Sequence, residues 1–206
     1  MKYPSETIEN SINEISKLPG IGKKTALRLS LHILKKEKEY SKSLADSIID
    51  LKEKTMFCKQ CHVISDKELC RNCDDENISI QKNKICVVED TPDVIAIQNT
   101  NQYNGLFHVI SGLISPINGV GPDNLNIDSL IKRIEKNKEI EEVIFALSPN
   151  LEGDTTTFYI SKKLSNLNLK ITTIARGVPI GGEIEYADEV TLGRSIITRI
   201  NYKGWI

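Results

Sequence analysis

Four cysteines carry the clearest chemical signal in the sequence. Cys58, Cys61, Cys70 and Cys73 form two C-x2-C pairs separated by eight residues. Each pair can place two thiolates on one cation, and two pairs complete a closed tetrahedral site for Zn²⁺. Four protein ligands leave no position for a substrate, so the spacing predicts one structural zinc per chain and no catalytic metal.

Other uses of cysteine fit this chain less well. Disulfides belong to oxidising compartments, and the N-terminus MKYPSETIEN has no apolar stretch of the signal-peptide kind. A redox site normally uses one C-x-x-C beside a βαβ pattern. His62 could replace a cysteine ligand, although an exposed loop histidine is the simpler interpretation. Cys86, within the apolar run ICVV, is expected in the core.

A glycine-containing turn with basic neighbours is the second chemical feature. In LPGIGKKTALRLS, residues 18–30, Gly20 and Gly22 allow a tight turn with positive φ directly before a helix. The N-terminus of a helix favours phosphate, and Lys23, Lys24 and Arg28 add cations beside it. We therefore expect contact with the DNA backbone that is independent of sequence. A purely structural turn between helices is the alternative.

The charge distribution agrees with that location. Residues 1–54 hold eleven basic and eight acidic residues, a net charge of +3, whereas the other 152 residues have a net charge of −4. A surface that faces phosphate is therefore expected near the N-terminus, although a solvated helix face would show the same excess.

Acidic residues follow two apolar runs in the second half of the chain. Glu89 ends the run beginning at Ile85 and precedes Asp93, while Glu152 and Asp154 follow the run VIFAL just before an expected helix. Ligand sites in open α/β sheets lie at the carboxyl ends of strands, where such carboxylates can hold Mg²⁺. Alternatively, they are helix N-terminal acids stabilised by the dipole.

The elements that must position these residues follow from periodicity and composition. The chain is 39% hydrophobic and has no run long enough to span a bilayer, so a cytoplasmic protein is expected. Apolar residues at helical spacing predict helices in residues 1–54. Strands are expected at 85–88, 108–110, 143–147 and 171–175, with a helix over Ile127–Ile134 between the second and third, which implies a mostly parallel sheet. Strands and turns are expected over 176–206.

The individual motifs resemble known folds. Residues 18–30 resemble a helix-hairpin-helix motif, and VVED with SPNLEGD resembles the two acidic motifs of a Toprim domain. Catalytic Toprim members carry a D-x-D at the second motif, where this chain has Ser148 and Asn150. The resemblance implies loss of catalysis. A weak Mg²⁺ site at Glu89, Glu152 and Asp154 stays open, as does a Mg²⁺-dependent nuclease or topoisomerase-like enzyme.

The order of the motifs, from about Leu18 to Arg199, is similar to the RecR family of bacterial recombination mediators. HVISGLISPINGVGP at 108–122 and ARGVPIGGEIEYADEVTLGRSI near the C-terminus add to the likeness. It implies an α+β protein of four modules: a helix-hairpin-helix module (1–54), a four-cysteine zinc knuckle (55–80), a Rossmann-like Toprim domain with a parallel sheet (81–175), and a short β/helical C-terminal segment for oligomerisation (176–206).

Family membership would imply a non-catalytic role in bacterial DNA repair. The family acts with RecO and RecF to help RecA load at single-stranded gaps in DNA coated by single-strand-binding protein, as dimers or ring-like tetramers. The resemblance assigns DNA contact to the hairpin residues and partner contact to Glu89, Asp93, Glu152 and Asp154. A pure assembly scaffold that never meets DNA is a further alternative.

The stretch Gly181–Asp188 resembles a Walker B segment. No G-x-x-x-x-G-K-[ST] phosphate loop accompanies it, so ATP hydrolysis is not predicted. Glu183, Glu185 and Asp188 could equally form the polar face of a strand.

Overall fold

The computed structural model describes residue 3, residues 5–74 and residues 79–201. The chain divides into two compact units, Met1–Thr55 and Met56–Ile206, and each is treated by itself. Among the described residues, no helix is both long and apolar enough to cross a membrane.

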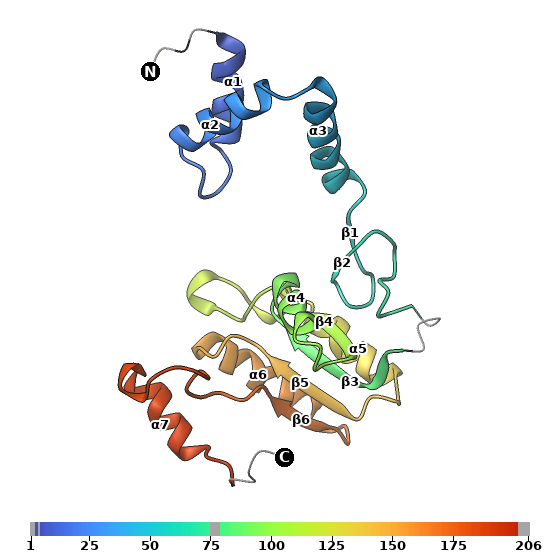
Figure 1. Cartoon of the computed structure of the whole chain (residues 1–206). Helices are drawn as coiled ribbons and strands as arrows, with labels where there is room; N and C mark the ends of the chain where they lie inside the picture. The colour runs from blue at the N-terminus through green and yellow to red at the C-terminus, as the bar shows by residue number, and fades with distance from the viewer. Residues whose placement is uncertain (1–2, 4, 75–78, 202–206) are drawn as a thin grey trace. The chain divides into compact units, whose positions relative to one another are not determined.

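The N-terminal unit consists of three helices, which confirms the helical prediction for this region: α1 (Glu6–Ile15), α2 (Lys23–Leu34) and α3 (Lys38–Glu53) (Figure 1). Helices α1 and α2 pack against each other through Ile12 and Ala26, both fully buried. A hydrogen bond of 3.0 Å joins the hydroxyls of Ser11 and Ser30 across the same contact. Small residues at the contact let the two helices approach closely, which fixes the turn between them.

The second unit begins with a small antiparallel hairpin, β1 (Met56–Phe57) and β2 (Ile64–Ser65). The first cysteine pair lies in and beside the loop of this hairpin, and the second pair follows β2. Cysteines 58, 61 and 73 are buried and Cys70 is partly buried, with Val63 packed against the group.

A four-stranded parallel sheet in the order β4-β3-β5-β6 forms the centre of this unit. The strands are β3 (Gln81–Val88), β4 (Gly105–Val109), β5 (Glu142–Ala146) and β6 (Lys170–Thr173), and the helices between them are α4 (Thr91–Asn99), α5 (Ile127–Lys136) and α6 (Leu151–Leu164). The prediction of a parallel sheet with helical crossovers is confirmed. The apolar second half of β3, residues 85–88, and the whole of β4 are buried, as expected for strands covered on both faces.

Each face of the sheet has its own core. Ile85 and Val87 of β3 join apolar residues of α5 and α6 on one face. Cys86 and Val88, on the other face, pack with Val94 of α4. Cys86 is therefore a core residue, as its sequence context predicts.

The C-terminal segment differs from part of the sequence prediction. Its described residues form a 3₁₀ turn at Ile184–Tyr186 and the helix α7 (Glu189–Ile197). The expectation of strands over residues 176–201 is wrong. The Asp188 side chain accepts a hydrogen bond of 2.9 Å from the Thr191 amide. An N-cap of this kind starts a helix where β-branched residues alone favour a strand.

Candidate functional site: a cysteine cluster beside a parallel sheet

The four cysteines converge on one point. Their Sγ atoms all lie within 4.8 Å of one another, and no other group of three or more candidate ligands gathers in the described residues. Tetrahedral Zn²⁺ with bonds of about 2.3 Å places its sulfurs roughly 3.8 Å apart. The donor set and its spacing therefore fit a zinc ion.

Backbone hydrogen bonds shape the loops that carry these thiols. The Cys58 amide donates to the Val63 carbonyl at 2.8 Å, and the His62 amide donates to the Cys58 carbonyl at 2.9 Å. Residue His62 has a φ of 62°, which turns the chain back directly after the second cysteine. The Cys70 amide points at the Cys58 sulfur from 3.4 Å, a donor that stabilises a thiolate.

Because the four thiols lie so close together, they shift the pKa values of Cys61 and Cys70 in opposite directions. Hydrogen bonding to Cys70 and Cys73, together with burial, raises the pKa of Cys61. Hydrogen bonds from Cys61 and Cys73 lower the pKa of Cys70. A bound cation removes this difference between the cysteines, because all four sulfurs then serve as thiolate ligands.

Arg133 connects the cluster to the sheet. The side chain is only 7% exposed. Its Nη2 donates to Cys73 Sγ at 3.3 Å and its Nη1 to the Phe107 carbonyl at 2.7 Å. A cation at this position offsets part of the negative charge that four thiolates bring to one ion.

Three further contacts attach the cluster to the edge strand β4 and to helix α5. The Val109 amide donates to the Cys61 carbonyl at 2.8 Å. His62 Nε2 lies 2.9 Å from the Ser129 hydroxyl, and its ring meets that of His108 edge to face with centroids 5.2 Å apart. The partly buried His62 is thus engaged with Ser129, and the four sulfurs form the ligand group without it.

Burial keeps these histidines neutral. Desolvation, and then the charge of Arg133, lowers the pKa of His108 to about 3 and also lowers the pKa of His62. His108 Nε2 lies 3.0 Å from the Asn126 carbonyl, which accepts a hydrogen bond from that nitrogen. The contact between the cysteine cluster and the sheet therefore includes two uncharged imidazole rings, those of His62 and His108.

The basic hairpin of the N-terminal unit is built as its sequence predicts. Gly20 has a φ of 78°, and Gly22 is the N-cap of α2 without a side chain to cap it. Lys23, Lys24 and Arg28 are exposed, and the first turn of α2 contains no acid. The start of this helix therefore presents amides and cations, with no carboxylate in its own first turn.

Glu89 and Glu152 are each bound to a serine. Glu89 Oε2 accepts a hydrogen bond of 2.9 Å from the hydroxyl of Ser148. Glu152 and Asp154 both lie in the first turn of α6, not before the helix as expected. Glu152 accepts a hydrogen bond from the Ser115 hydroxyl. Glu89 and Glu152 do not converge with a third acid to form a cation site in the described residues.

The other two acids also have protein partners. Asp154 Oδ1 lies 2.7 Å from Arg176 and its Oδ2 lies 3.6 Å from Arg194. The hydrogen bond from Arg176 is the main reason that the pKa of Asp154 is lowered. Asp93 closes a capping box at the start of α4 by accepting from the Asp90 amide at 3.0 Å.

Sequence reasoning missed several of these partners. Arg133 occurs three residues after Leu130, on the apolar face of α5. A charged residue at such a position signals a buried partner. Arg176 and Arg194 lie far from Asp154 in sequence, and Ser115 lies in a loop, so no local pattern points to them.

These features define the class of the protein: a Toprim-type α/β protein with a closed four-cysteine site against the edge of its sheet. Family models match three parts of the chain. The helix-hairpin-helix region of RecR matches residues 8–52, the Toprim domain matches residues 83–175, and the C-terminal region of RecR matches residues 177–200.

Full-length relatives agree with these matches. The chain is 58% identical to the recombination protein RecR of Cytophaga hutchinsonii over 97% of its length and 96% of that protein. It is 53% identical to RecR of Amoebophilus asiaticus over 98% of its length and all of that protein. RecR of Flavobacterium johnsoniae is 51% identical over 98% and 97% of the two chains. The chain belongs to the RecR family.

Proposed function

We propose that this protein is a non-catalytic recombination mediator that binds DNA through its N-terminal hairpin. The observation that carries the proposal is the start of α2. There, Lys23, Lys24 and Arg28 are exposed around a turn whose residue Gly20 has positive φ and whose N-cap is Gly22.

This geometry favours the phosphate backbone as ligand. Amides at the start of a helix and adjacent lysines attract an anion. An added Cβ at Gly20 or Gly22 would meet no atom within 4 Å, so the turn presents open space to a ligand. Contacts of this kind do not read bases, so binding is expected to be independent of sequence.

Family membership supplies the biological context of the proposal. The DNA is single-stranded or a gap junction between single strand and duplex. The partners are RecO and RecF, and the outcome is loading of RecA at gaps covered by single-strand-binding protein, in the cytoplasm. A homodimer or a homotetrameric ring is the assembly, with the C-terminal segment 176–206 contributing to it.

The arrangement of the acids supports a role without catalysis. Metal-dependent strand cleavage requires carboxylates free to hold Mg²⁺ near a phosphodiester. Here Glu89 and Glu152 accept hydrogen bonds from serines, and Asp154 pairs with two arginines. We assign Glu89, Asp93, Glu152 and Asp154 to structure and partner contact, and zinc, one per chain, to the cysteine cluster.

Charge reversal in the hairpin tests DNA binding. Lys23→Glu/Lys24→Glu/Arg28→Glu should weaken binding to a fluorescent gapped duplex by on the order of a hundredfold or more and flatten the salt dependence. The control Lys38→Glu/Lys42→Glu/Lys52→Glu makes the same charge change on α3 and should retain most of the affinity. Equal affinity of the hairpin variant and the unaltered protein would refute the role of the hairpin.

Two further measurements decide between this proposal and its alternatives. Nicking or relaxation of supercoiled DNA in Mg²⁺, abolished by Glu89→Gln, would establish a Toprim enzyme instead. A tetramer that binds RecO but no DNA, observed by light scattering with and without gapped DNA, would establish a scaffold.

A further inference from the structure

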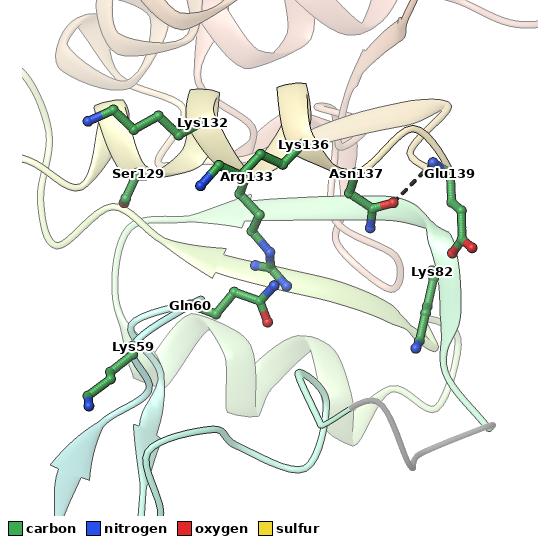
Figure 2. Close-up of a pocket in the computed structure, with 9 residues that line it drawn as sticks. All are labelled: Lys59, Gln60, Lys82, Ser129, Lys132, Arg133, Lys136, Asn137 and Glu139. Carbon is green, nitrogen blue, oxygen red and sulfur yellow. Dashed lines mark hydrogen bonds between the residues drawn. The ribbon is translucent and has the colours of Figure 1, made fainter.

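A basic cavity lies between the cysteine knuckle, the start of β3 and helix α5. Its volume is about 600 Å³ (Figure 2). The basic residues that line it are Lys59, Lys82, Lys132, Arg133 and Lys136, and Glu139 is the single acid among its described lining residues. The family assignment and the hairpin do not account for this concentration of positive charge.

Two of the lysines repel each other unless an anion is present. Lys132 and Lys136 are one turn apart on α5, and like charges at this spacing destabilise a helix. Both side chains are exposed, and neither forms an ion pair within the described residues. Lys59 does pair with Glu68 at 2.6 Å, but both partners are about 70% exposed, so that pair is weak.

The buried arginine provides an independent observation. Arg133 uses both terminal nitrogens on Phe107 and Cys73, yet its buried Nε has no hydrogen-bond partner in the described part of the chain. Figure 2 shows this side chain reaching from α5 toward Gln60. A buried donor without an acceptor is costly. The positive charge of this guanidinium at the cavity wall attracts an anion.

We propose that this cavity binds the phosphodiester backbone of a nucleic acid strand, as a second contact in addition to that of the hairpin. The inference rests on the proposed function. The cations come from three separate segments of the chain and line one cavity, so a single strand bound there could contact more than one of them. None of the described lining residues is aromatic, so contact with the backbone is favoured over base stacking.

The first test neutralises the exposed lysines of α5 in the full chain. Lys132→Gln/Lys136→Gln should reduce affinity for a fluorescent single-stranded oligonucleotide on the order of tenfold. It should also reduce the slope of log affinity against log salt by about 1.4, at roughly 0.7 for each lost phosphate contact. The control Lys67→Gln/Lys162→Gln changes the same charge at two exposed lysines outside the cavity and should leave both quantities unchanged. Circular dichroism and metal content verify that every variant is folded.

The outcomes separate this inference from the function on which it rests. If the unaltered protein binds no oligonucleotide, both fail. If the hairpin variant loses affinity while Lys132→Gln/Lys136→Gln binds as tightly as the unaltered protein, the cavity proposal alone is overturned.

A further arm identifies the source of the phosphate. Hydrogen exchange of α5 is followed with inorganic phosphate, with pyrophosphate and with the oligonucleotide. Protection by the oligonucleotide that the double variant loses supports the proposal. Protection by the small anions together with full oligonucleotide affinity of the variant shows a small-anion site and overturns it. Loss of affinity for an acidic protein partner, with DNA affinity unchanged, also overturns it.

Discussion

Arg133 and Cys73 are sixty positions apart in the chain, yet the guanidinium Nη2 of Arg133 lies 3.3 Å from the sulfur of Cys73. The same guanidinium donates to the carbonyl of Phe107 in β4. One buried cation therefore links the cysteine cluster to the edge strand of the sheet. It also places positive charge where bound zinc would leave an excess of negative charge on the sulfurs.

Removal of this cation should weaken metal binding. Arg133→Met keeps an unbranched apolar side chain at this position, so the variant loses only the positive charge and the hydrogen bonds of the guanidinium. We expect zinc affinity to fall about 10- to 100-fold, measured by competition with a chromophoric chelator. Lys132→Met, at the exposed neighbour, should bind zinc as the unaltered protein does. Equal zinc affinity of the two variants would contradict the link.

His108 should make the protein sensitive to mild acid. Its pKa is about 3 in the folded chain against 6.5 for an ordinary histidine, so the unfolded chain binds more protons between these values. The resulting stability is therefore fully present above pH 6.5 and is lost as the pH falls, by up to about 1.4 kcal/mol for each pH unit. Urea unfolding at pH 7 and pH 5 measures the loss.

The substitution His108→Gln isolates this contribution. Glutamine can still donate to the Asn126 carbonyl but does not titrate, so the variant should lose less stability than the unaltered protein between the two pH values. The control His32→Gln, at an exposed histidine of the N-terminal unit, should show the full loss. The same pH dependence in all three proteins would exclude His108 as its cause.

Gly153 should tolerate no side chain. It lies in the first turn of α6, where an added Cβ would fall 2.0 Å from the carbonyl oxygen of Ser148. Gly153→Ala should therefore lower the free energy of unfolding by about 1–3 kcal/mol, although alanine is the better helix former. Gly193→Ala is the control, because a Cβ on this helical glycine meets no atom within 4 Å. Chemical denaturation should show that control unchanged or slightly stabilised.

Local patterns in the sequence predicted the parts of the fold and site that depend on neighbouring residues. The two C-x2-C pairs predict the cysteine cluster, because each pair places two sulfurs close enough together to bind the same cation. The apolar runs at Ile85 and Val143 identify buried parallel strands. The turn at Gly20 is predictable because positive φ strongly favours glycine.

Contacts between distant segments could not be predicted in the same way. The pairing of Asp154 with Arg176 and Arg194 depends on where the C-terminal segment returns to α6. The prediction of strands over residues 176–201 is wrong because their β-branched residues favour a strand, whereas the Asp188 cap starts the helix α7. The basic cavity combines residues of three segments, and each of its lysines by itself resembles an ordinary solvated side chain.

The Asp154 pairs should order the C-terminal segment more than they stabilise the whole unit. Asp154 is 40% exposed and Arg194 is 48% exposed, so water screens the attraction and its contribution to global stability is expected below about 1 kcal/mol. Asp154→Asn removes both ion pairs while it keeps the shape of the side chain. Hydrogen exchange should then increase across residues 176–194 and remain unchanged in β3 and β5.

Because Arg176 lowers the pKa of Asp154, this protection should persist above the ordinary pKa of an aspartate. It should disappear in the unaltered protein only as the pH falls through the lowered value. Unchanged exchange of α7 in Asp154→Asn would show that the apolar contacts of the segment, and not these pairs, hold it in place.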